Sequence, residues 1–382
     1  MELSYNPEYP SIPHLREKAR KRIPRFAFEY LDGGCNDEVN LHRNTADIRE
    51  VQLKPYYLEA YEGSSLKTEL FGHEYDAPFG VAPVGLQGLM WPRATEILAQ
   101  SAKEHNLPFI LSTVATASIE KVARLTEGKA WFQLYHPRED ALRDDLLKRA
   151  AESGYETLVI LSDVPTFGYR PKEIKNGLAI PPRMTFRNLV QILGSPKWAW
   201  QTLSAGQPKF ETLSPYIPRG MNLRHLGLFM NKTFNGRLNE ERIKVIRDQW
   251  KGNLVLKGVA SEKDTEKAIH LGLDGIIVSN HGGRQLDAGQ STIRSLTPIA
   301  KKYKGQIKIM MDSGMRSGPD IACTLASGAE FAFMGRSFMY GVAALGREGG
   351  HHTMSMLKVQ FRQVMEQVCC ERVSDLPRHL AL

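Results

Sequence analysis

The sequence predicts a (β/α)8 barrel, and three observations carry this prediction. Eight short, almost continuously apolar runs follow one another along the chain, as expected for strands buried on both faces of a parallel sheet. Helical patterns separate these runs, and most runs begin about 22 to 30 residues after the preceding one. The length of 382 residues suffices for such a barrel with insertions. An open, doubly wound sheet is the alternative.

The predicted elements follow in a regular order. The strands cover residues 79–82, 109–111, 131–134, 157–161, 254–256, 275–278, 307–311 and 331–334. Apolar residues at helical spacing predict helices that include 94–105, 139–153, 262–271 and 319–327. Residues 14–60 are predicted to form a helical preface, and a helix over 353–368 is predicted to close the chain before a short tail.

The interval between the fourth and fifth strands is about 90 residues, which exceeds one helix and two loops. We therefore predict an insertion over about 181–238, on the face that carries the strand-to-helix loops. With this insertion, residues 1–382 form one barrel domain. The formal net charge of the chain is +8, and residues 183–237 contribute eight basic residues and one acid, Glu211. The basic positions are 183, 187, 197, 209, 219, 224, 232 and 237.

The composition is that of a globular protein, with 42% hydrophobic and 24% charged residues. The first 13 residues contain no apolar signal segment, and no run of about 18 apolar residues predicts a membrane span. Four cysteines without CxxC spacing predict free thiols in a reducing compartment: Cys35, Cys323, Cys369 and Cys370. No metal site is predicted.

The motif SNHGGRQLD, residues 279–287, directly follows the sixth predicted strand. In a barrel this position lies at the catalytic rim. A neutral imidazole at His281 can accept a proton, and the guanidinium of Arg284 can hold a carboxylate through two hydrogen bonds. A glycine-containing surface loop is the alternative. The motif therefore predicts acid–base chemistry on a substrate with a carboxylate.

Two further loops predict a phosphate site. Residues 312–316, with the sequence DSGMR, end the seventh strand, and Gly335 and Arg336 end the eighth. In barrels the loops after these two strands often bind phosphate, for which backbone amides near glycines are suited. No dinucleotide fingerprint is evident, which argues against NAD or FAD.

The motif SNHGGRQLD resembles the active-site signature of the FMN-dependent α-hydroxy-acid oxidases and dehydrogenases. The resemblance runs in order from about Pro24 to Gly350, through FEYLDGG, APVGL, LST, WFQLY, DVPTFGYR, LKGV, MDSGMR and FMGR. GLQGLMWP and DVPTFGYR are most similar to the (S)-mandelate dehydrogenase members of the (S)-mandelate and L-lactate dehydrogenase branch. The resemblance also implies a homotetramer.

The resemblance implies a role for each matching residue. His281 resembles the base, Asp163 the carboxylate that pairs with it, and Arg284 the main carboxylate clamp. Arg170 resembles a second arginine near the substrate; Tyr30 and Tyr135 resemble phenols that contact the substrate carboxylate and hydroxyl. FMN is implied to contact Pro83, Val84, Gly85, Ser112, Gln133, Lys257, Ser279, Asp312, Ser313, Gly314, Arg316, Gly335 and Arg336.

Three positions depart from the family pattern. Leu161 stands at a usual threonine position, and strand alternation points the adjacent Ser162 to the opposite face. Val114 stands where the oxidases often carry tryptophan, which predicts a differently shaped substrate pocket. Gly85 stands where they tend to carry alanine, which resembles the dehydrogenase branch and predicts slow reoxidation by oxygen.

The predicted function is FMN-dependent oxidation of an L-2-hydroxy acid, of mandelate or lactate type, to the 2-oxo acid, with a quinone or another non-oxygen acceptor. The alternatives are an oxidase that forms hydrogen peroxide, a non-redox barrel that binds a phosphorylated ligand, and a membrane-surface binding protein.

The insertion is predicted to dock the enzyme on the cytoplasmic side of the cell membrane, where a quinone could accept electrons. Its basic residues attract anionic headgroups. Its apolar residues are predicted to be exposed and to enter the headgroup boundary: Leu189, Ile192, Leu193, Trp198, Trp200, Leu226, Leu228, Phe229 and Met230. An active-site lid and an oligomer contact are the alternatives. Nucleic-acid binding is not predicted, because one localised loop shows no groove pattern of aromatic and basic residues.

Overall fold

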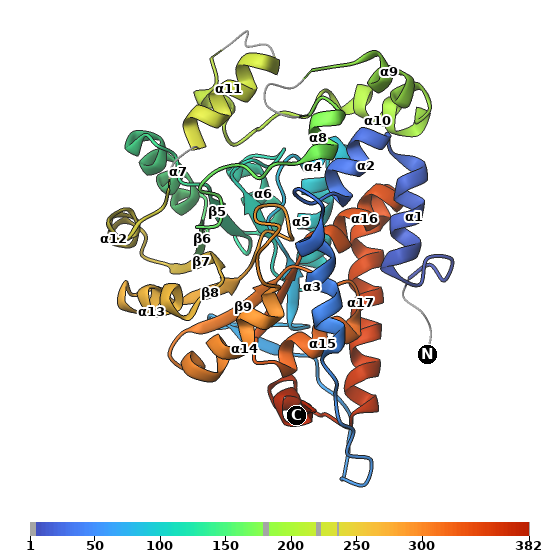
Figure 1. Cartoon of the computed structure of the whole chain (residues 1–382), viewed down its shortest axis with the longest axis vertical. Coiled ribbons are helices and arrows are strands. Elements are labelled where there is room, and N and C mark those ends of the chain that lie inside the picture. Colours follow the sequence, from blue (N-terminus) through green and yellow to red (C-terminus); the bar gives the residue numbers. More distant parts are fainter. Residues whose placement is uncertain (1–4, 179–182, 219–222, 235–236, 382) are drawn as a thin grey trace.

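Eight parallel strands form the centre of the computed structural model, which describes residues 5–178, 183–218, 223–234 and 237–381 (Figure 1). They are β3 (Phe79–Val81), β4 (Ile110–Ser112), β5 (Trp131–Leu134), β6 (Thr157–Leu161), β7 (Asn253–Val259), β8 (Gly275–Val278), β9 (Lys308–Asp312) and β10 (Phe331–Met334). Their order is β3-β10-β9-β8-β7-β6-β5-β4. A parallel bridge between Val81 and Phe109 closes the ring, which confirms the predicted (β/α)8 barrel.

Successive residues of a strand point to opposite faces of the sheet, so only every second side chain points into the barrel. Most of these short strands therefore contribute one side chain to the barrel interior. These side chains form one buried cluster that includes Ala82, Ile110, Trp131, Val159, Val255, Ile277, Met310, Phe331 and Phe333. A hairpin of β1 (Thr68–Leu70) and β2 (His73–Tyr75) adds Leu70 and Tyr75 to this cluster. The sequence analysis did not predict this hairpin, because three-residue strands show almost no periodicity.

A helix follows each strand and covers the outside of the barrel. These helices are α5 (Ala94–Glu104), α6 (Ile119–Thr126), α7 (Asp140–Glu152), α12 (Glu240–Gln249), α13 (Glu262–His270), α14 (Thr292–Tyr303), α15 (Gly318–Ala326) and α16 (Arg336–Leu345). Several begin at a side-chain cap: Ser261 Oγ, for example, accepts a hydrogen bond from the Asp264 amide at 3.1 Å. The predicted helices are confirmed to within a few residues at each end.

The preface helix α1 and the closing helix α17 lie on one side of the barrel, where both pack against α16. The preface contains α1 (Ile12–Arg22), α2 (Arg25–Asp32) and α3 (Val39–Glu50), and α17 (Gly349–Gln367) begins four residues before its predicted start. In Figure 1, α1 lies beside α16, and α16 lies beside α17. Because α2 ends near the catalytic rim, the preface brings Tyr30 to the site described below. Among the described residues, no helix is long and apolar enough to cross a membrane.

The insertion forms a helical layer at the end of the barrel that carries the strand-to-helix loops (Figure 1). Helix α8 (Pro171–Lys175) precedes the predicted segment, which contains α9 (Phe186–Leu193), α10 (Pro196–Ala205), the 3-10 turn η1 (Ser214–Tyr216) and α11 (Leu223–Phe234). Residues 181, 182, 219–222, 235 and 236 of the predicted segment lie outside the described residues, as do the side chains of residues 223–227, which include Arg224 and Leu226.

The prediction that the apolar residues of the insertion are exposed is wrong for two of them. Trp198 and Met230 are buried, and Ile192 and Phe229 are partly buried against the core. The Trp198 indole donates to the carbonyls of Leu89 and Met90, both at 3.1 Å, and its ring lies edge-on to Phe26. Trp198 therefore anchors the insertion to the barrel rim. Leu189, Leu193, Trp200 and Leu228 are exposed, as predicted.

Candidate active site

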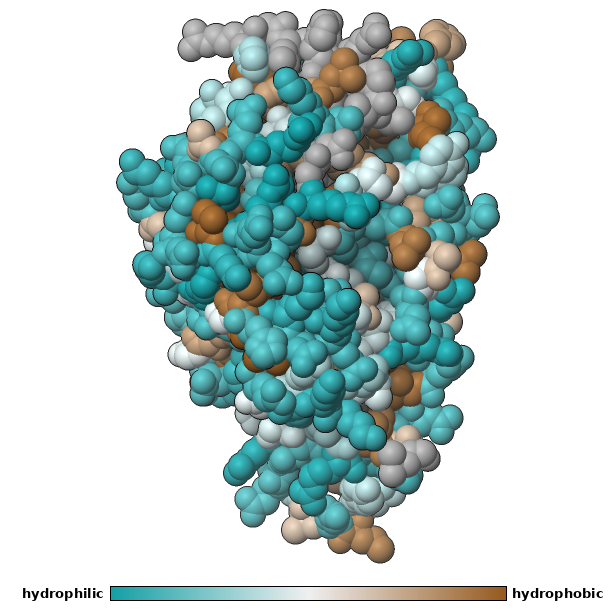
Figure 2. Space-filling model, turned by 60° about the vertical axis from the view of Figure 1, so that its left-hand side comes forward, coloured by the Kyte–Doolittle hydropathy of each residue, from teal (hydrophilic) through white to brown (hydrophobic). Residues whose placement is uncertain are grey.

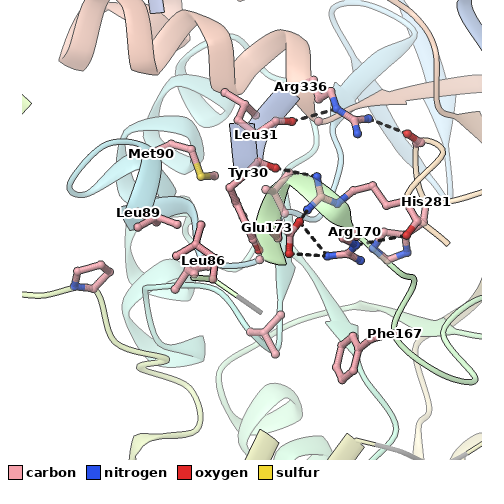
Figure 3. A pocket seen from close by; sticks show the side chains of 18 of the residues that line it. Tyr30, Leu31, Leu86, Leu89, Met90, Phe167, Arg170, Glu173, His281 and Arg336 are labelled. Atoms are coloured by element: carbon pink, nitrogen blue, oxygen red, sulfur yellow. Dashed lines mark hydrogen bonds and ion pairs between the residues drawn. The ribbon is translucent and has the colours of Figure 1, made fainter. Parts of the chain in front are cut away.

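A cavity of about 1190 Å³ opens at the carboxyl ends of the strands, between the barrel rim and the insertion (Figure 3). Its polar wall contains Tyr30, Tyr135, Arg170, Glu173, Lys257, His281 and Arg284. Its apolar wall contains Leu86, Leu89, Met90, Val114, Leu178, Ile192, Trp198, Phe210, Met230 and Phe234. A concave, mostly apolar site with a few convergent polar groups is the usual form of a small-molecule site.

His281 occupies a strained backbone position directly after β8. Its φ is +58°, and the φ values of Gly282 and Gly283 are +65° and +73°. Residues other than glycine rarely adopt this left-handed region of backbone conformation. Backbone strain of this kind clusters at functional sites. A Cβ on Gly282 would lie 2.4 Å from Nη1 of Arg336, and one on Gly283 would lie 2.5 Å from the Leu41 amide nitrogen. The paired glycines thus allow the loop to turn His281 toward the cavity.

Asp163 orients the His281 imidazole. Oδ1 of Asp163 lies 3.2 Å from Nδ1 of His281, so Nδ1 carries the proton and Nε2 is left as an acceptor. Burial lowers the pKa of His281, and the charge of Asp163 offsets only part of this effect. Burial opposes ionisation of Asp163, but His281 and Lys257 outweigh it, so the pKa of Asp163 lies below its ordinary value. At neutral pH the pair is therefore a carboxylate beside a neutral imidazole.

Two phenols lie beside the imidazole and the arginines. The Tyr135 hydroxyl is 3.5 Å from Nε2 of His281. Burial is the main cause that raises the pKa of both Tyr30 and Tyr135, and the charges of Glu173 and Asp163, respectively, raise it further. Both phenols therefore stay protonated at neutral pH and can donate hydrogen bonds to a bound anion.

Arg284 is held from several sides. Its Nη1 donates to the carbonyls of Tyr30 at 2.7 Å and Gly33 at 2.9 Å, and its guanidinium lies 5.0 Å from the centre of the Tyr30 ring. Its Nη2 lies 2.5 Å from Oε1 of Glu173. The guanidinium is thus fixed at the cavity wall, where it can bind an anion.

Arg170 joins the same group from the start of α8. It donates to the Arg284 carbonyl at 3.3 Å and to Oε1 of Gln285 at 3.1 Å, and its Nη1 lies 3.4 Å from Oε1 of Glu173. The sequence analysis missed Glu173 and Gln285. Arg170 and Glu173 are three residues apart at the start of a helix, a spacing that is typical of an ion pair. This spacing could have indicated Glu173 from the sequence.

A second buried cation lies at the end of β7. Nζ of Lys257 is 3.1 Å from Oδ2 of Asp312 and 2.9 Å from the Ser279 hydroxyl. Burial alone would lower the pKa of Lys257, but Asp312 and Asp163 outweigh it and raise the pKa above its ordinary value. Lys257 therefore remains charged beside the cavity.

The loops after β9 and β10 form a cationic, glycine-rich corner. Ser313 and Gly314 have φ values of +77° and +94°. Arg336 donates to the carbonyls of Leu31, Gly282 and Gly33, at 3.0, 2.9 and 2.7 Å. Burial lowers the pKa of Arg336 to about 9, and the charges of Arg284 and Arg316 contribute to this shift. Buried cations that repel one another favour binding of an anion at this corner.

The residues predicted to contact FMN divide into two groups. Pro83, Val84, Gly85, Lys257, Asp312, Ser313, Gly314, Arg316, Gly335 and Arg336 line the cavity. Ser112, Gln133 and Ser279 are almost completely buried behind its wall, as is most of Asp163, whose Oδ2 has no hydrogen-bond partner in the described part of the chain.

The departures from the family pattern also have structural consequences. Leu161 is buried, and the Ser162 hydroxyl donates to the Lys257 carbonyl at 2.9 Å. A Cβ on Gly85 would lie 2.8 Å from Cγ2 of Val114, so these two residues shape the wall together.

This donor set fits FMN. A buried ammonium at Lys257 suits the electron-rich edge of a flavin ring, because a cation there stabilises the reduced form. At Gly85 an added Cβ would meet Val114, so a larger residue there would shift the Val114 side chain that also lines the cavity. The glycine-rich corner with Arg316 and Arg336 suits a phosphate.

Comparison with known proteins agrees with this geometry. Residues 19–382 match the FMN-dependent dehydrogenase family. The chain is 37% identical over 371 residues to an L-lactate dehydrogenase of Caulobacter sp. strain K31, covering 97% of each chain. It is 35% identical over 364 residues to an L-lactate dehydrogenase of Vibrio cholerae, covering 95% of this chain and 96% of the relative.

Solved structures show the same likeness. The monotopic membrane protein (S)-mandelate dehydrogenase superposes with a TM-score of 0.92 at 32% identity, covering 97% of this chain and 98% of that one. A mandelate oxidase superposes with a TM-score of 0.83 at 28% identity, covering 98% of both chains.

Proposed function

The chain belongs to the FMN-dependent dehydrogenase family, and from this membership we propose that it oxidises an L-2-hydroxy acid with a bulky apolar side chain. The sequence analysis predicted FMN-dependent oxidation of a 2-hydroxy acid, and this family membership agrees with that prediction. One observation carries the proposal for the site: the proton-accepting Nε2 of His281 and the guanidiniums of Arg170 and Arg284 face one largely buried cavity.

The cofactor half of the site has a defined set of residues. Pro83, Val84 and Gly85 would lie against the flavin ring, and Lys257 would lie at its electron-rich edge. Gly314, Arg316, Gly335 and Arg336, with Asp312 and Ser313 in the same loop, would hold the phosphate end. Ser112, Gln133 and Ser279 would support this half from behind the wall. When bound, FMN supplies the two-electron acceptor for the hydrogen that leaves the α-carbon.

The substrate half performs binding and proton transfer. Arg284, Arg170 and the Tyr30 phenol would bind the substrate carboxylate, which places the hydroxyl near Tyr135. Nε2 of His281 then accepts a proton from the substrate. The imidazolium that forms is stabilised by the adjacent Asp163 carboxylate.

The apolar wall supports a substrate side chain larger than a methyl group. Leu86, Leu89 and Met90 face the cavity from one side in Figure 3, opposite the polar residues Arg170 and His281. Val114 and Trp198 extend this wall. Transfer of apolar surface to such a wall is favourable by about 25 cal/mol per Å². An aromatic or long aliphatic side chain would therefore bind more tightly than that of lactate.

The outer surface of the insertion supports docking on a membrane. Helix α9 presents Phe186, Leu189, Val190 and Leu193 to solvent, at the i, i+3, i+4 and i+7 positions of one face. Two of its polar residues, Asn188 and Gln191, point inward: Asn188 donates to the Asn176 carbonyl at 2.9 Å, and Gln191 accepts from the Phe26 amide at 2.9 Å. A helix with its apolar face outward has its partner outside the chain.

Neighbouring residues extend this docking surface. Trp200 and Leu203 on α10 are exposed, and so are the basic residues Arg183, Arg187, Lys197 and Lys209. Figure 2 shows apolar side chains in brown at the upper end of the molecule, where Figure 1 places the insertion. Basic and apolar residues together suit an anionic bilayer. We propose peripheral attachment to the cytoplasmic face of the cell membrane, with a membrane quinone as electron acceptor. The homotetramer likewise stays a prediction.

The proposed function is tested by anaerobic mixing of the FMN-loaded enzyme with a panel of L-2-hydroxy acids. Loss of flavin absorbance near 450 nm should be faster with L-mandelate or a long-chain acid than with L-lactate, and absent with the D-enantiomers. If no L-2-hydroxy acid bleaches the flavin, the proposed function is wrong. Hydrogen peroxide at a rate equal to turnover under air would instead favour an oxidase.

A further inference from the structure

The Arg284 guanidinium is already immobilised without help from a carboxylate. Two backbone carbonyls, of Tyr30 and Gly33, accept hydrogen bonds from its Nη1, and its plane packs on the Tyr30 ring. These contacts come from α2 and the residue that follows it. The orientation of Arg284 therefore does not depend on Glu173.

Glu173 nevertheless lies directly between the two arginines. It is the third residue of α8, and its side chain is only 13% exposed. Oε1 contacts Nη2 of Arg284 at 2.5 Å, and both carboxylate oxygens lie 3.4 to 3.5 Å from Nη1 of Arg170. Figure 3 shows Glu173 turned toward Arg170 at the cavity wall. Its carboxylate thus contacts Nη2 of Arg284 and Nη1 of Arg170, the two terminal nitrogens that the hydrogen bonds to carbonyls and to Gln285 leave open.

The chemistry of this contact is the chemistry of substrate binding. A substrate carboxylate needs the same Nη donors of Arg284 and Arg170. Two neighbouring buried guanidiniums repel each other, and one carboxylate between them cancels much of that repulsion. A second carboxylate would bring two anions to two cations and would meet Glu173 at close range. The two carboxylates therefore compete for one position.

We propose that Glu173 is an internal competitor for the substrate carboxylate, which binds by displacing it from Arg284. This inference rests on the proposed function, because it takes Arg284 as the carboxylate clamp. Displacement separates the Glu173 carboxylate from Arg284, while Glu173 itself stays on α8, the helix that precedes the insertion. Glu173 sets how tightly the site binds an anion and does not take part in proton transfer.

The proposal predicts that anion affinity rises when Glu173 is neutralised, whereas a supporting role would predict that it falls. If Glu173 held Arg284 in place, its neutralisation would weaken anion binding. As a competitor, its neutralisation strengthens anion binding, because the charge of the arginine pair is then available to the ligand.

The experiment measures binding of phenylglyoxylate, a non-reactive 2-oxo acid anion, to the FMN-loaded enzyme by the change in flavin absorbance. Glu173→Gln keeps the size of the side chain and removes its charge. We expect its dissociation constant to fall by about tenfold. Glu173→Asp keeps the charge but withdraws it by one methylene, and a fall of about threefold is expected. The uncharged phenylglyoxylamide should bind both variants and the unmodified enzyme equally well.

Glu74→Gln is the matched control, because Glu74 forms an exposed ion pair with Lys67 on the hairpin and does not line the cavity. Equal or weaker phenylglyoxylate binding in both Glu173 variants would overturn the proposal, even if the flavin is still reduced by hydroxy acids. If the unmodified enzyme binds no 2-oxo acid and is not bleached by any hydroxy acid, the proposed function fails instead.

Discussion

The catalytic rim and helix α9 both turn polar residues inward, but for different reasons. At the rim, charges are buried in pairs, Lys257 with Asp312 and His281 with Asp163. In α9, Asn188 and Gln191 are turned inward while Phe186 and Leu193 are exposed. Burial of a charge is costly unless it is paired, so buried pairs in a cavity indicate chemistry. An exposed apolar helix face is also costly, and it indicates an external partner.

The cavity lies between two surfaces with different roles, the catalytic rim of the barrel and the outer face of the insertion. Its floor and part of its polar wall, with Lys257 and His281, come from the barrel, which is fixed by closed hydrogen-bonded strands. Its roof comes from the insertion, which Trp198 anchors to the rim. Changes at the rim should therefore alter chemistry without altering docking, and changes on the outer face of α9 should do the reverse.

The largest expected effect is at His281. His281→Gln keeps a polar side chain but removes the proton acceptor, so flavin reduction by the best substrate should slow by about 10³- to 10⁴-fold. Stopped-flow absorbance measures this rate, and the bound FMN spectrum reports whether the cofactor is retained. A rate within tenfold of the unmodified enzyme would break the assignment of chemistry to the rim.

A smaller loss, of about 10²-fold, is expected for Asp163→Asn, because the imidazole loses the charge that stabilises its protonated form. The neutral imidazole is the active form, so kcat/KM should rise as pH increases through the pKa of His281, which lies below its ordinary value. Asp163 raises this pKa, so its neutralisation should move the acid limb to lower pH. A pH–rate profile that does not move would contradict the pairing.

The docking surface is addressed by the double variant Phe186→Glu/Leu193→Glu. Sedimentation with vesicles of anionic phospholipid should show binding weakened by at least about tenfold, since two apolar contacts become two negative charges. Turnover with a soluble dye as acceptor should stay within about twofold. Leu58→Glu is the control, because Leu58 is fully exposed in the loop before β1, away from the insertion. Unchanged vesicle binding by the double variant would reject the membrane proposal.

The smallest effect tests the anchor between the two regions. Trp198→Phe leaves the carbonyls of Leu89 and Met90 without the indole donor, which should lower the free energy of unfolding by about 1–2 kcal/mol. Urea denaturation followed by circular dichroism measures this difference. Trp200→Phe, on the same helix but exposed, should change it by less than about 0.5 kcal/mol. Equal effects of the two variants would mean that Trp198 is not an anchor.

The sequence was informative where local pattern decides the structure. The barrel strands are short, apolar and regularly spaced, so their positions could be predicted to within a few residues. The SNHGGRQLD motif could be assigned to the rim because it follows the strand Gly275–Val278 directly. Strand order then brings Asp163, Lys257 and His281 together, because parallel strands all end at the same face.

Only the tertiary structure decided three other features. The inward or outward direction of an apolar residue in the insertion depends on which surface it meets, so Trp198 and Trp200, two residues apart, have opposite environments. The backbone carbonyls that fix Arg284 come from α2, about 250 positions away, and no spacing in the sequence indicates that contact. The spacing of Glu173 indicates only an ion pair with Arg170, and the fold alone sets it between two guanidiniums. Periodicity is a local property of the chain, whereas electrostatic pairing depends on distances that folding alone establishes.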